Sequence, residues 1–412
     1  MKTMGIIAEY NPFHNGHFFH IAQAKEITGA DYCIVIMSGN YVQRGIPAIM
    51  DKVLRTRAAL MCGADLVIEL PVHYATASAE YFAGGAAALL DRLGVTDCLC
   101  FGSECGHIEP LLRLCDILSS ESVEFKSLLQ KHLKAGSPYP KAKNLALSET
   151  FPQLADELTL LQHPNNILGV EYLKALKKRG SHITPYTISR KGSDYHDTSL
   201  NTAYSSALAI RNSLSQDSDI SLIKEFIPSL VYKEMSKDYQ KCFPLFPDDF
   251  SSLLAYKIIQ EQGTGFDAYF DIDKEFSDKV KKLFHSYTGF SAFCDALKSK
   301  NMTYTRISRN LLHILLNIYQ ADIDLFCSQD YVCYAKILGF KKESAPLLSK
   351  IKADSSIPLI SKMADASNLI ASETGRKMLI QEIQADDIYR MVVQQKYHVR
   401  LPNEYQRQIV II

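Results

Sequence analysis

The sequence predicts an α/β protein in which a parallel-sheet domain is followed by a mostly α-helical domain. In the first hundred residues, short β-branched runs alternate with longer helical patterns, which is typical of βαβ units around a parallel sheet. After about residue 216 the strand signals fade and amphipathic helical runs dominate. A chain of 412 residues, 47% of them hydrophobic, is long enough to form two substantial cores. We therefore predict domains at residues 1–216 and 217–412.

The first domain is predicted element by element. Short apolar runs predict strands at 5–8, 32–37, 66–70 and 98–101, and helical patterns between them predict helices at 16–28, 50–62 and 79–93. Residues 105–161 interrupt this rhythm with a helical, lysine-bearing insertion whose residues 136–140 resemble a turn. A helix at 165–178, a strand at 183–188 and a helix at 203–214 complete the domain. In the second domain, periodic runs predict helices at 277–285, 309–319 and 370–381.

The composition limits which binding partners and which cellular compartment we expect for this protein. The chain has 45 basic and 45 acidic residues, so a polyanion has to be held by local patches. No signal-peptide pattern opens the chain and the longest apolar stretches, such as 311–318, are too short for a bilayer, so we expect a cytoplasmic protein without a membrane partner. Cys98, Cys100 and Cys105 with His107 lack a paired Cys-x-x-Cys, which favours buried thiols over a zinc site, and we predict no metal ligands.

The chemistry is expected at the carboxyl ends of the strands. In parallel sheets ligands bind there, so the loops that start at Glu9, Ser38, Pro71 and Gly102 should converge on one crevice. Gly102, just past the strand predicted at 98–101, either lets a nucleobase or ribose approach the backbone or is a plain turn glycine.

The segment between the first strand and its helix contains His14-Asn15-Gly16-His17. A helix N-terminus binds phosphate, Gly16 allows close approach to the backbone, and two imidazoles can donate to the same anion. This pattern suits attack on the α-phosphate of a nucleotide. The alternative is a helix cap beside a packed surface histidine. Neither a G-x-G-x-x-G nor a P-loop pattern follows the first strand, which excludes hydride transfer and P-loop chemistry.

His14-Asn15-Gly16-His17 resembles the HxGH signature of the nucleotidylyltransferase superfamily, which shares its catalytic core with class I aminoacyl-tRNA synthetases. Beyond this motif, the whole chain resembles the bacterial tRNA(Met) cytidine acetate ligases. The matching stretches are residues 9–17, 37–45, 64–71, 101–104 and 164–169, together with Arg190 and residues 195–197.

This resemblance implies a Rossmann-like nucleotidylyltransferase domain and an ATP-dependent ligase that forms a carbon–nitrogen bond. It implies that acetate is activated as acetyl-adenylate and then joined to N4 of the wobble cytidine in the anticodon loop of elongator tRNA(Met). Mg²⁺ is expected to accompany the triphosphate. His14 and His17 are the implied catalytic residues. The implied ATP site comprises Ile7, Ala8, Glu9, Tyr10, Asn11, Pro12, Phe13, His14, Asn15, Gly16, His17, Phe18, Phe19, His20, Gly102, Asn165 and Arg190.

Several of these positions have simpler explanations. Asn165 is either a helix N-cap or a reader of adenine edges, and Arg190 either clamps phosphates or pairs with Asp194 or Asp197. Residues 206–211 resemble the late phosphate-binding motif of the superfamily but depart from it at the second Ser and the Thr, so Arg211 is either a pyrophosphate contact or part of a surface salt bridge. Gln43 and Arg44 either line the acetate or RNA side of the crevice or form a solvated turn.

The RNA-binding surface and the reaction leave alternatives open. Two rivals to the ligase are an adenylyltransferase that makes a dinucleotide cofactor and a non-catalytic, nucleotide-sensing RNA-binding protein. The sequence predicts neither the oligomeric state nor the acetate pocket. The candidate RNA contacts are basic or aromatic: Lys126, Lys131, Lys134, Lys141, Lys143, Lys177, Lys178, Arg179, Tyr304, Arg306, Arg309, Tyr334, Lys341 and Lys342.

Overall fold

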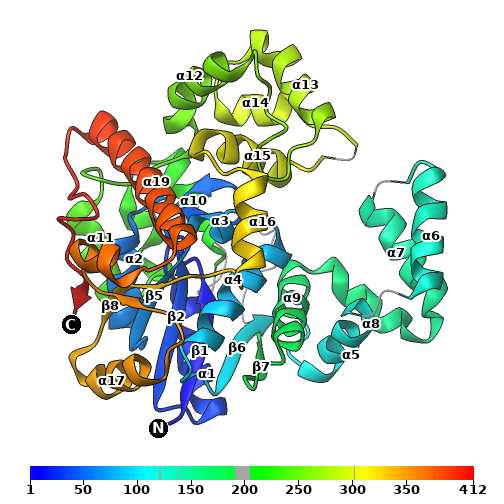
Figure 1. The fold of residues 1–412 in the computed structure, drawn as a ribbon. Coiled ribbons are helices and arrows are strands. Elements are labelled where there is room, and N and C mark those ends of the chain that lie inside the picture. The colour runs from blue at the N-terminus through cyan, green and yellow to red at the C-terminus, as the bar shows by residue number, and fades with distance from the viewer. Residues whose placement is uncertain (120–121, 138, 191–204, 301) are drawn as a thin grey trace.

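A central sheet runs through the protein. The computed structural model describes residues 1–119, 122–137, 139–190, 205–300 and 302–412. The strand order of the sheet is β10-β8-β5-β2-β1-β6-β7, with β9 beside β8 (Figure 1). Strands β1, β2, β5, β6 and β7 are mutually parallel, which confirms the predicted parallel sheet. They are β1 (Thr3–Ala8), β2 (Tyr32–Ser38), β5 (Leu66–Leu70), β6 (Cys98–Ser103) and β7 (Thr184–Ser189).

Helices cover both faces of this sheet. Along β2, Cys33 and Val35 belong to one core and Ile34 and Ile36 to the other, because successive side chains of a strand point to opposite faces. The first core includes side chains of α1, α2, α10 and α11, and the second includes α4, α9 and α17. These helices are α1 (Asn15–Thr28), α2 (Lys52–Met61), α4 (Ala79–Arg92), α9 (Pro164–Arg179), α10 (Ala207–Gln216), α11 (Ser229–Asp238) and α17 (Ala345–Asp354).

The second half is mostly helical, as predicted, but it also adds strands to the sheet. β8 (Ala335–Phe340) pairs antiparallel with β5, and β9 (Leu359–Ile360) and β10 (Val410–Ile411) pair with β8. Both halves therefore share one sheet, and the boundary near Gln216 stays a prediction. The other helices of this half are α12 (Ser251–Glu261), α13 (Lys274–Leu283), α14 (Phe290–Ala296), α15 (Tyr304–Leu316), α16 (Gln320–Ser328), α18 (Ala366–Leu369) and α19 (Glu373–Tyr397).

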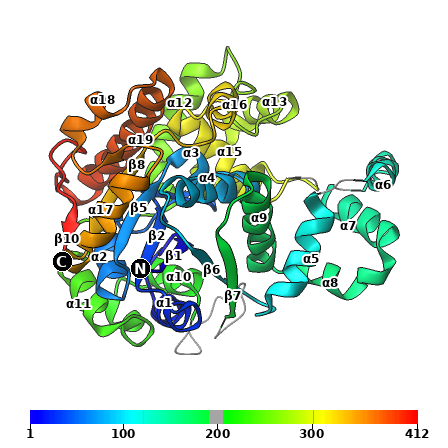
Figure 2. The same cartoon turned by 60° about the horizontal axis from the view of Figure 1, so that its bottom comes forward.

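The insertion between β6 and α9 is helical, as predicted, and forms an arm at the side of the sheet (Figure 2). Two of its helices pack on each other around Phe125, Ala146 and Leu147. No helix in the described ranges is both long and apolar enough for a membrane span. The helices of the arm are α5 (Ile108–Ser119), α6 (Val123–Lys134), α7 (Tyr139–Thr150) and α8 (Ala155–Thr159).

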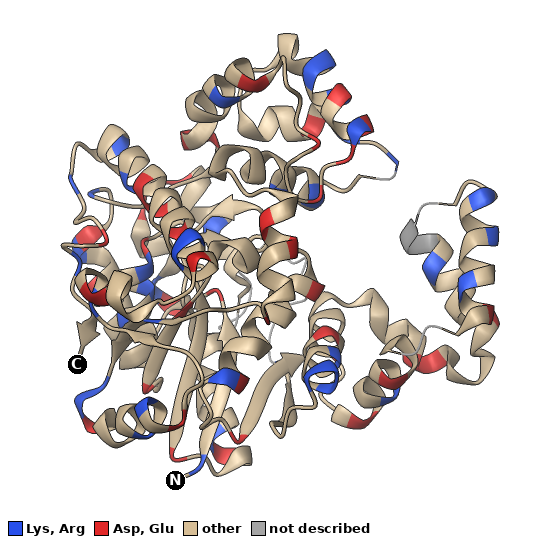
Figure 3. Cartoon of the chain, in the orientation of Figure 1, with Lys and Arg blue, Asp and Glu red and all other residues tan. Residues whose placement is uncertain are grey.

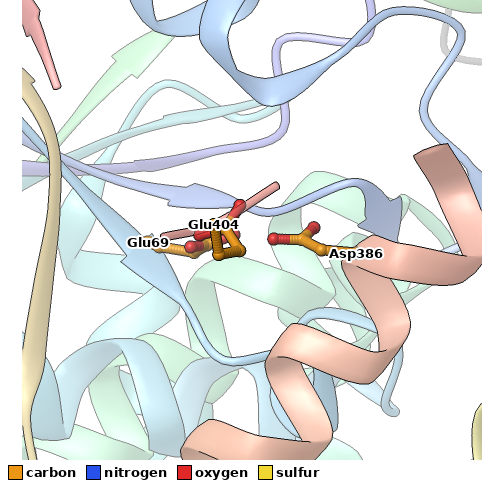
Figure 4. Close-up of side chains that lie close together, drawn as sticks. All are labelled: Glu69, Asp386 and Glu404. Carbon is orange, nitrogen blue, oxygen red and sulfur yellow. The ribbon is translucent and has the colours of Figure 1, made fainter. Parts of the chain in front are cut away.

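A buried ion cluster ties the end of the chain to the sheet. The carboxylates of Glu69 on β5, Asp386 on α19 and Glu404 lie close together (Figure 4). Lys52 Nζ is 2.6 Å from Glu69 Oε1 and 3.2 Å from Glu404 Oε1, and it also bonds Asp386. Lys336 Nζ on β8 is 2.8 Å from Glu69 Oε2 and bonds Glu404. Two ammonium groups thus face three carboxylates, and burial and the neighbouring Glu404 raise the pKa of Asp386 well above its usual value, so the cluster is an internal ion network.

Candidate active site

One pocket of about 240 Å³ lies at the carboxyl ends of β1, β6 and β7. The loops after β1 and β2 reach it, as predicted, and Gly102 lines it from within β6. The loop that starts at Pro71 does not line it, because α19 covers that loop and Glu382 Oε2 accepts a 2.6 Å bond from Val72 N. The lining residues are Ile7, Ala8, Glu9, Tyr10, His14, Gly16, His17, Phe19, His20, Gln43, Arg44, Phe82, Phe101, Gly102, Asn165, Leu168, Tyr172, Ile188, Ser189, Arg190, Ser206, Ala207, Leu208 and Arg211.

Most of the predicted nucleotide-binding positions meet in this pocket, but five do not line it. Phe13 is buried in the core and Phe18 is 48% exposed. Asn15 Nδ2 donates to the Glu225 carbonyl at 2.8 Å. The remaining two, Asn11 and Pro12, shape the loop: Asn11 Oδ1 accepts from Ile49 N at 2.8 Å, and the Asn11–Pro12 peptide is cis.

The backbone fixes the tautomers of the two motif histidines. His14 Nδ1 accepts from Gly16 N at 3.0 Å, and His17 Nδ1 accepts from His14 N at 3.3 Å. Each neutral ring therefore carries its proton on Nε2. The two rings stack with centroids 3.8 Å apart. Two N–H donors are thus presented side by side at the N-terminus of α1.

Burial keeps these imidazoles neutral. It lowers the pKa of His14 to about 3, with Arg190 and Arg211 adding to the effect. Burial, His14 and Arg190 lower the pKa of His17 well below its usual value, and burial with Arg190 lowers that of His20 to about 4. At neutral pH the histidines therefore act as hydrogen-bond donors, and the positive charge of the pocket comes from its arginines, Arg44, Arg190 and Arg211.

Arg190 reaches the pocket from the end of β7, and Arg211 reaches it from α10. Arg211 is buried and its Nη1 donates to the Asn11 carbonyl at 2.6 Å, so the alternative of a surface salt bridge is wrong. Arg190 Nη1 donates to Asn165 Oδ1 at 3.1 Å. Its two alternative partners, Asp194 and Asp197, lie outside the described residues.

Glu104, to which we assigned no role from the sequence, holds one wall of the pocket. Its Oε1 accepts from Asn165 N at 3.2 Å and from Asn165 Nδ2 at 2.6 Å, and its Oε2 accepts from Asn166 N at 2.8 Å. This carboxylate therefore satisfies the N-terminus of α9 and orients the amide that accepts from Arg190. Asn165 thus has internal partners for both polar atoms of its side chain. An acidic residue directly after a strand was the signal in the sequence.

Glu104→Gln is expected to raise the KM for ATP about tenfold with a smaller change in kcat. The amide replaces one acceptor oxygen with a donor that faces the backbone N–H groups of α9, so Asn165 and then Arg190 lose their orientation. Pyrophosphate exchange at varied ATP concentration measures the effect. The matched control is Glu109→Gln, an exposed acid in the first turn of α5. An unchanged KM in Glu104→Gln contradicts the positioning role.

Arg55 on α2, also missed from the sequence, clamps the strand ends beneath the pocket. Its Nη1 donates to the carbonyls of Glu9 at 2.7 Å and Ser38 at 3.0 Å, and its Nη2 bonds the Gly39 carbonyl. The side chain is fully buried. A charged residue on a predicted helix is normally expected at the surface, so the sequence pattern did not predict a buried role for Arg55.

Two glycines of the pocket are required by close contacts. A Cβ on Gly16 would lie 2.8 Å from His14 Cε1 and 3.0 Å from His14 Nδ1. Gly102 lies within β6, so the alternative of a turn glycine is wrong, and a Cβ there would lie 3.3 Å from Arg190 Cγ. Both glycines therefore make room for side chains of the pocket.

Gly16→Ala is expected to reduce activity on the order of 10²-fold while leaving the fold intact. The methyl group pushes the His14 ring out of place, whereas alanine itself favours a helix. Steady-state kinetics and thermal unfolding measure the two effects. Gly263→Ala is the control, because a Cβ there meets nothing within 4 Å. Full activity in Gly16→Ala contradicts the requirement for a fixed His14.

The loop after β2 reaches the pocket as a hairpin rather than a solvated turn. It consists of β3 (Tyr41–Val42) and β4 (Ile46–Pro47). Gln43 N donates to Glu9 Oε1 at 2.8 Å, and the buried Gln43 Nε2 has no hydrogen-bond partner within the described ranges. An unused amide donor beside the motif is a suitable contact for a substrate oxygen.

The cysteines pack as the composition suggested. Cys98 and Cys100 are buried in β6, and burial raises the pKa of Cys100 to about 12. Cys105 Sγ contacts the His107 carbonyl oxygen at 3.3 Å. Cys98 and Cys100 are therefore free thiols of the core, whereas Cys105 is only partly buried.

A parallel sheet with a His-x-Gly-His segment at the first crossover defines the class of nucleotidyltransferases that act on the α-phosphate. Consistent with this, the HIGH nucleotidyl transferase family model matches residues 1–404. The tRNA(Met) cytidine acetate ligase of Thermoanaerobacter sp. (strain X514) is 39% identical over 392 residues, which are 95% of each chain. That of Acetivibrio thermocellus is 37% identical over 422 residues, covering 100% of both. This chain belongs to the tRNA(Met) cytidine acetate ligase family within the HIGH nucleotidyl transferases.

Solved structures agree over the full length. The crystal structure of Thermotoga maritima TmcAL in apo form I has 29% sequence identity and a TM-score of 0.94, with 100% of both chains covered. The crystal structure of Thermotoga maritima TmcAL bound with α-thio ATP has 28% identity and a TM-score of 0.91, again over 100% of both chains. The nucleotidyltransferase fold predicted from the sequence is therefore confirmed.

Proposed function

We propose that this protein is an ATP-dependent ligase that joins acetate to N4 of the wobble cytidine in elongator tRNA(Met). The observation that carries the proposal is the pair of Nε2–H donors of His14 and His17 at the N-terminus of α1, in a pocket that arginines also line. The curated relatives, which match over nearly their whole length, are named tRNA(Met) cytidine acetate ligases. A solved relative was crystallised with an ATP analogue.

The reaction proceeds in two steps. An acetate oxygen attacks the α-phosphate of ATP and displaces pyrophosphate, which forms acetyl-adenylate. The cytosine N4 amine then attacks the acyl carbon, loses a proton and displaces AMP. His14 and His17 donate to the α-phosphate oxygens as charge develops, and Arg190 and Arg211 neutralise the outgoing phosphates. The other pocket residues predicted from the sequence form the walls of this ATP site.

We propose Mg²⁺ as the cation that accompanies the triphosphate, because it binds phosphate oxygens and retains several waters. Glu9 is the one acid among the described residues that line the pocket, and its Oε1 already accepts from Gln43 N. Because the pocket offers so few protein ligands, it suits an ion that is bound mainly by the phosphates of the nucleotide. We also propose a cytoplasmic location, where ATP and tRNA are present.

A single assay separates this function from its rivals. The protein is incubated with ATP, Mg²⁺, labelled acetate and purified elongator tRNA(Met), and the label in RNA is counted. Label in the RNA supports the ligase. A cofactor adenylyltransferase would instead turn over ATP only with a small phosphate compound, and a nucleotide-sensing RNA-binding protein would bind ATP without turnover. Either of these results would overturn the proposal.

A further inference from the structure

The tip of the arm has an unusual charge distribution. Residues 125–148, which run from α6 into α7, contain five lysines and no Asp or Glu. The acids of the insertion lie outside this stretch of the sequence, at Glu109, Asp116, Glu121, Glu124, Glu149, Asp156 and Glu157. The net charge of the whole chain is zero, but positive charge is concentrated in this stretch of the arm. The lysines of this tip are Lys126, Lys131, Lys134, Lys141 and Lys143.

The lysines of α6 lie on the exposed side of that helix. Lys126, Lys131 and Lys134 are exposed, whereas Phe125 is buried with Ala146 and Leu147 of α7. Figure 3 shows several blue segments on the ribbon of the arm's outer helices. The side chain of Lys131 is 69% exposed, and its contact with Glu149 is long, at 3.9 Å. Glu149 of α7 also lies 2.8 Å from His132 Nε2, so one acid reaches this face. Soluble helices usually mix both signs more evenly, and the excess of lysines on α6 favours a polyanion.

The outer helices of the arm contribute little to the central fold, whereas α5 packs into the second core through Leu111, Leu114 and Cys115. Helices α6 and α7 pack on each other around a small core of their own, and α7 also contacts α8. The arm is therefore free to serve as a binding element, and Figures 1 and 2 both show it standing away from the sheet.

The base of the arm lies at the rim of the pocket. The insertion follows β6 and leads into α9, and Gly102 near the end of β6 and Asn165 at the start of α9 both line the pocket. Glu104 joins the two ends through its bonds to Asn165 and Asn166. A ligand held along the arm is thereby held next to the site where the acyl-adenylate forms.

Several of the other basic candidates are engaged in ion pairs or buried, whereas Lys178 and Lys342 are exposed. Lys177 bonds Asp116 at 2.7 Å, and Arg179 bonds Asp91 and Asp330. Arg306 forms a two-point pair with Asp271. Tyr334 is 3% exposed, so the expectation that it stacks on an RNA base is wrong. Burial lowers the pKa of Arg309, which also lies inside the fold.

We propose that the lysine tip of the arm binds the phosphate backbone of the RNA substrate while the target base reaches the pocket. This inference rests on the proposed function for the identity of the polyanion. Lysines on an exposed helix suit non-specific phosphate contacts, which fix register and orientation rather than read bases. RNA specificity must then come from the region of the pocket.

The test compares Lys131→Ala/Lys134→Ala with Lys350→Ala/Lys352→Ala, a matched pair on α17. Filter binding of purified elongator tRNA(Met) is measured at several salt concentrations, together with acetate-dependent pyrophosphate exchange. We expect the arm variant to lose about tenfold in tRNA affinity, and the slope of log K against log salt to fall by about one to two. Its pyrophosphate exchange should stay at the wild-type rate, and the α17 variant should match wild type in both assays.

Lys131→Arg/Lys134→Arg, which keeps both charges, should bind tRNA like wild type. Wild-type affinity and salt slope in the alanine variant would overturn the proposal, as would equal loss of binding in the alanine and arginine variants. Failure of the proposed function would look different: the wild-type protein would bind the tRNA through its arm without transferring acetate.

Discussion

His17→Ala is expected to lower the rate of acetate-dependent pyrophosphate exchange about 10²- to 10³-fold, equivalent to about 2.7–4 kcal/mol. The imidazole donates through Nε2 because its Nδ1 already accepts from His14 N. Alanine removes that donor at the point where negative charge develops on the α-phosphate. The loss therefore falls on kcat more than on the KM for ATP.

The fold should survive this change, since His17 sits in the first turn of α1 and its ring faces the pocket. His17→Asn, which keeps an N–H donor, should retain more activity than alanine. His285→Ala serves as the control, because that histidine is exposed on the helical half. A correctly folded His17→Ala protein with wild-type exchange would contradict the assigned role.

The sheet and the motif were predictable from the sequence because their signals are local. Short apolar runs separated by helical patterns placed the five parallel strands to within a few residues, and the His-x-Gly-His segment sits between the first of them and its helix. The hairpin at 41–47 and the strand β8 were missed. β8 pairs with β5, more than 260 residues earlier in the chain, and no local pattern reports such a pairing.

The extent of α19 and two residues of the site were not predicted, because they depend on contacts of charged residues inside the fold. The helix predicted at 370–381 extends as α19 to Tyr397, because Glu382 and Asp386 read as solvent-facing although both are buried. Their partners include Lys52 and the backbone N–H of Val72, residues that only the folded chain brings near. Glu104 and Arg55 escaped notice in the site for the same reason: each acts through contacts between distant segments.

The second large effect concerns stability rather than catalysis. Lys52→Met is expected to lower the free energy of unfolding by about 3–5 kcal/mol, because it leaves Glu69, Asp386 and Glu404 buried with one cation fewer. Burial alone would raise the pKa of Glu404, yet Lys52 and Lys336 hold it well below its usual value. Urea unfolding measures the loss, and Lys352→Met on the exposed side of α17 should change stability by less than about 0.5 kcal/mol.

The pH dependence of that loss follows from the same carboxylates. Without Lys52, the pKa of Glu404 in the folded state rises toward or above its unfolded value. The folded variant therefore binds more protons than the folded wild type at the same pH. An acid whose folded pKa is raised costs stability as the pH rises through that range, and protonation at lower pH relieves the cost. The deficit of Lys52→Met relative to wild type should therefore be larger at pH 8 than at pH 5. A deficit that is constant with pH would mean that lost packing, rather than unpaired charge, destabilises the variant.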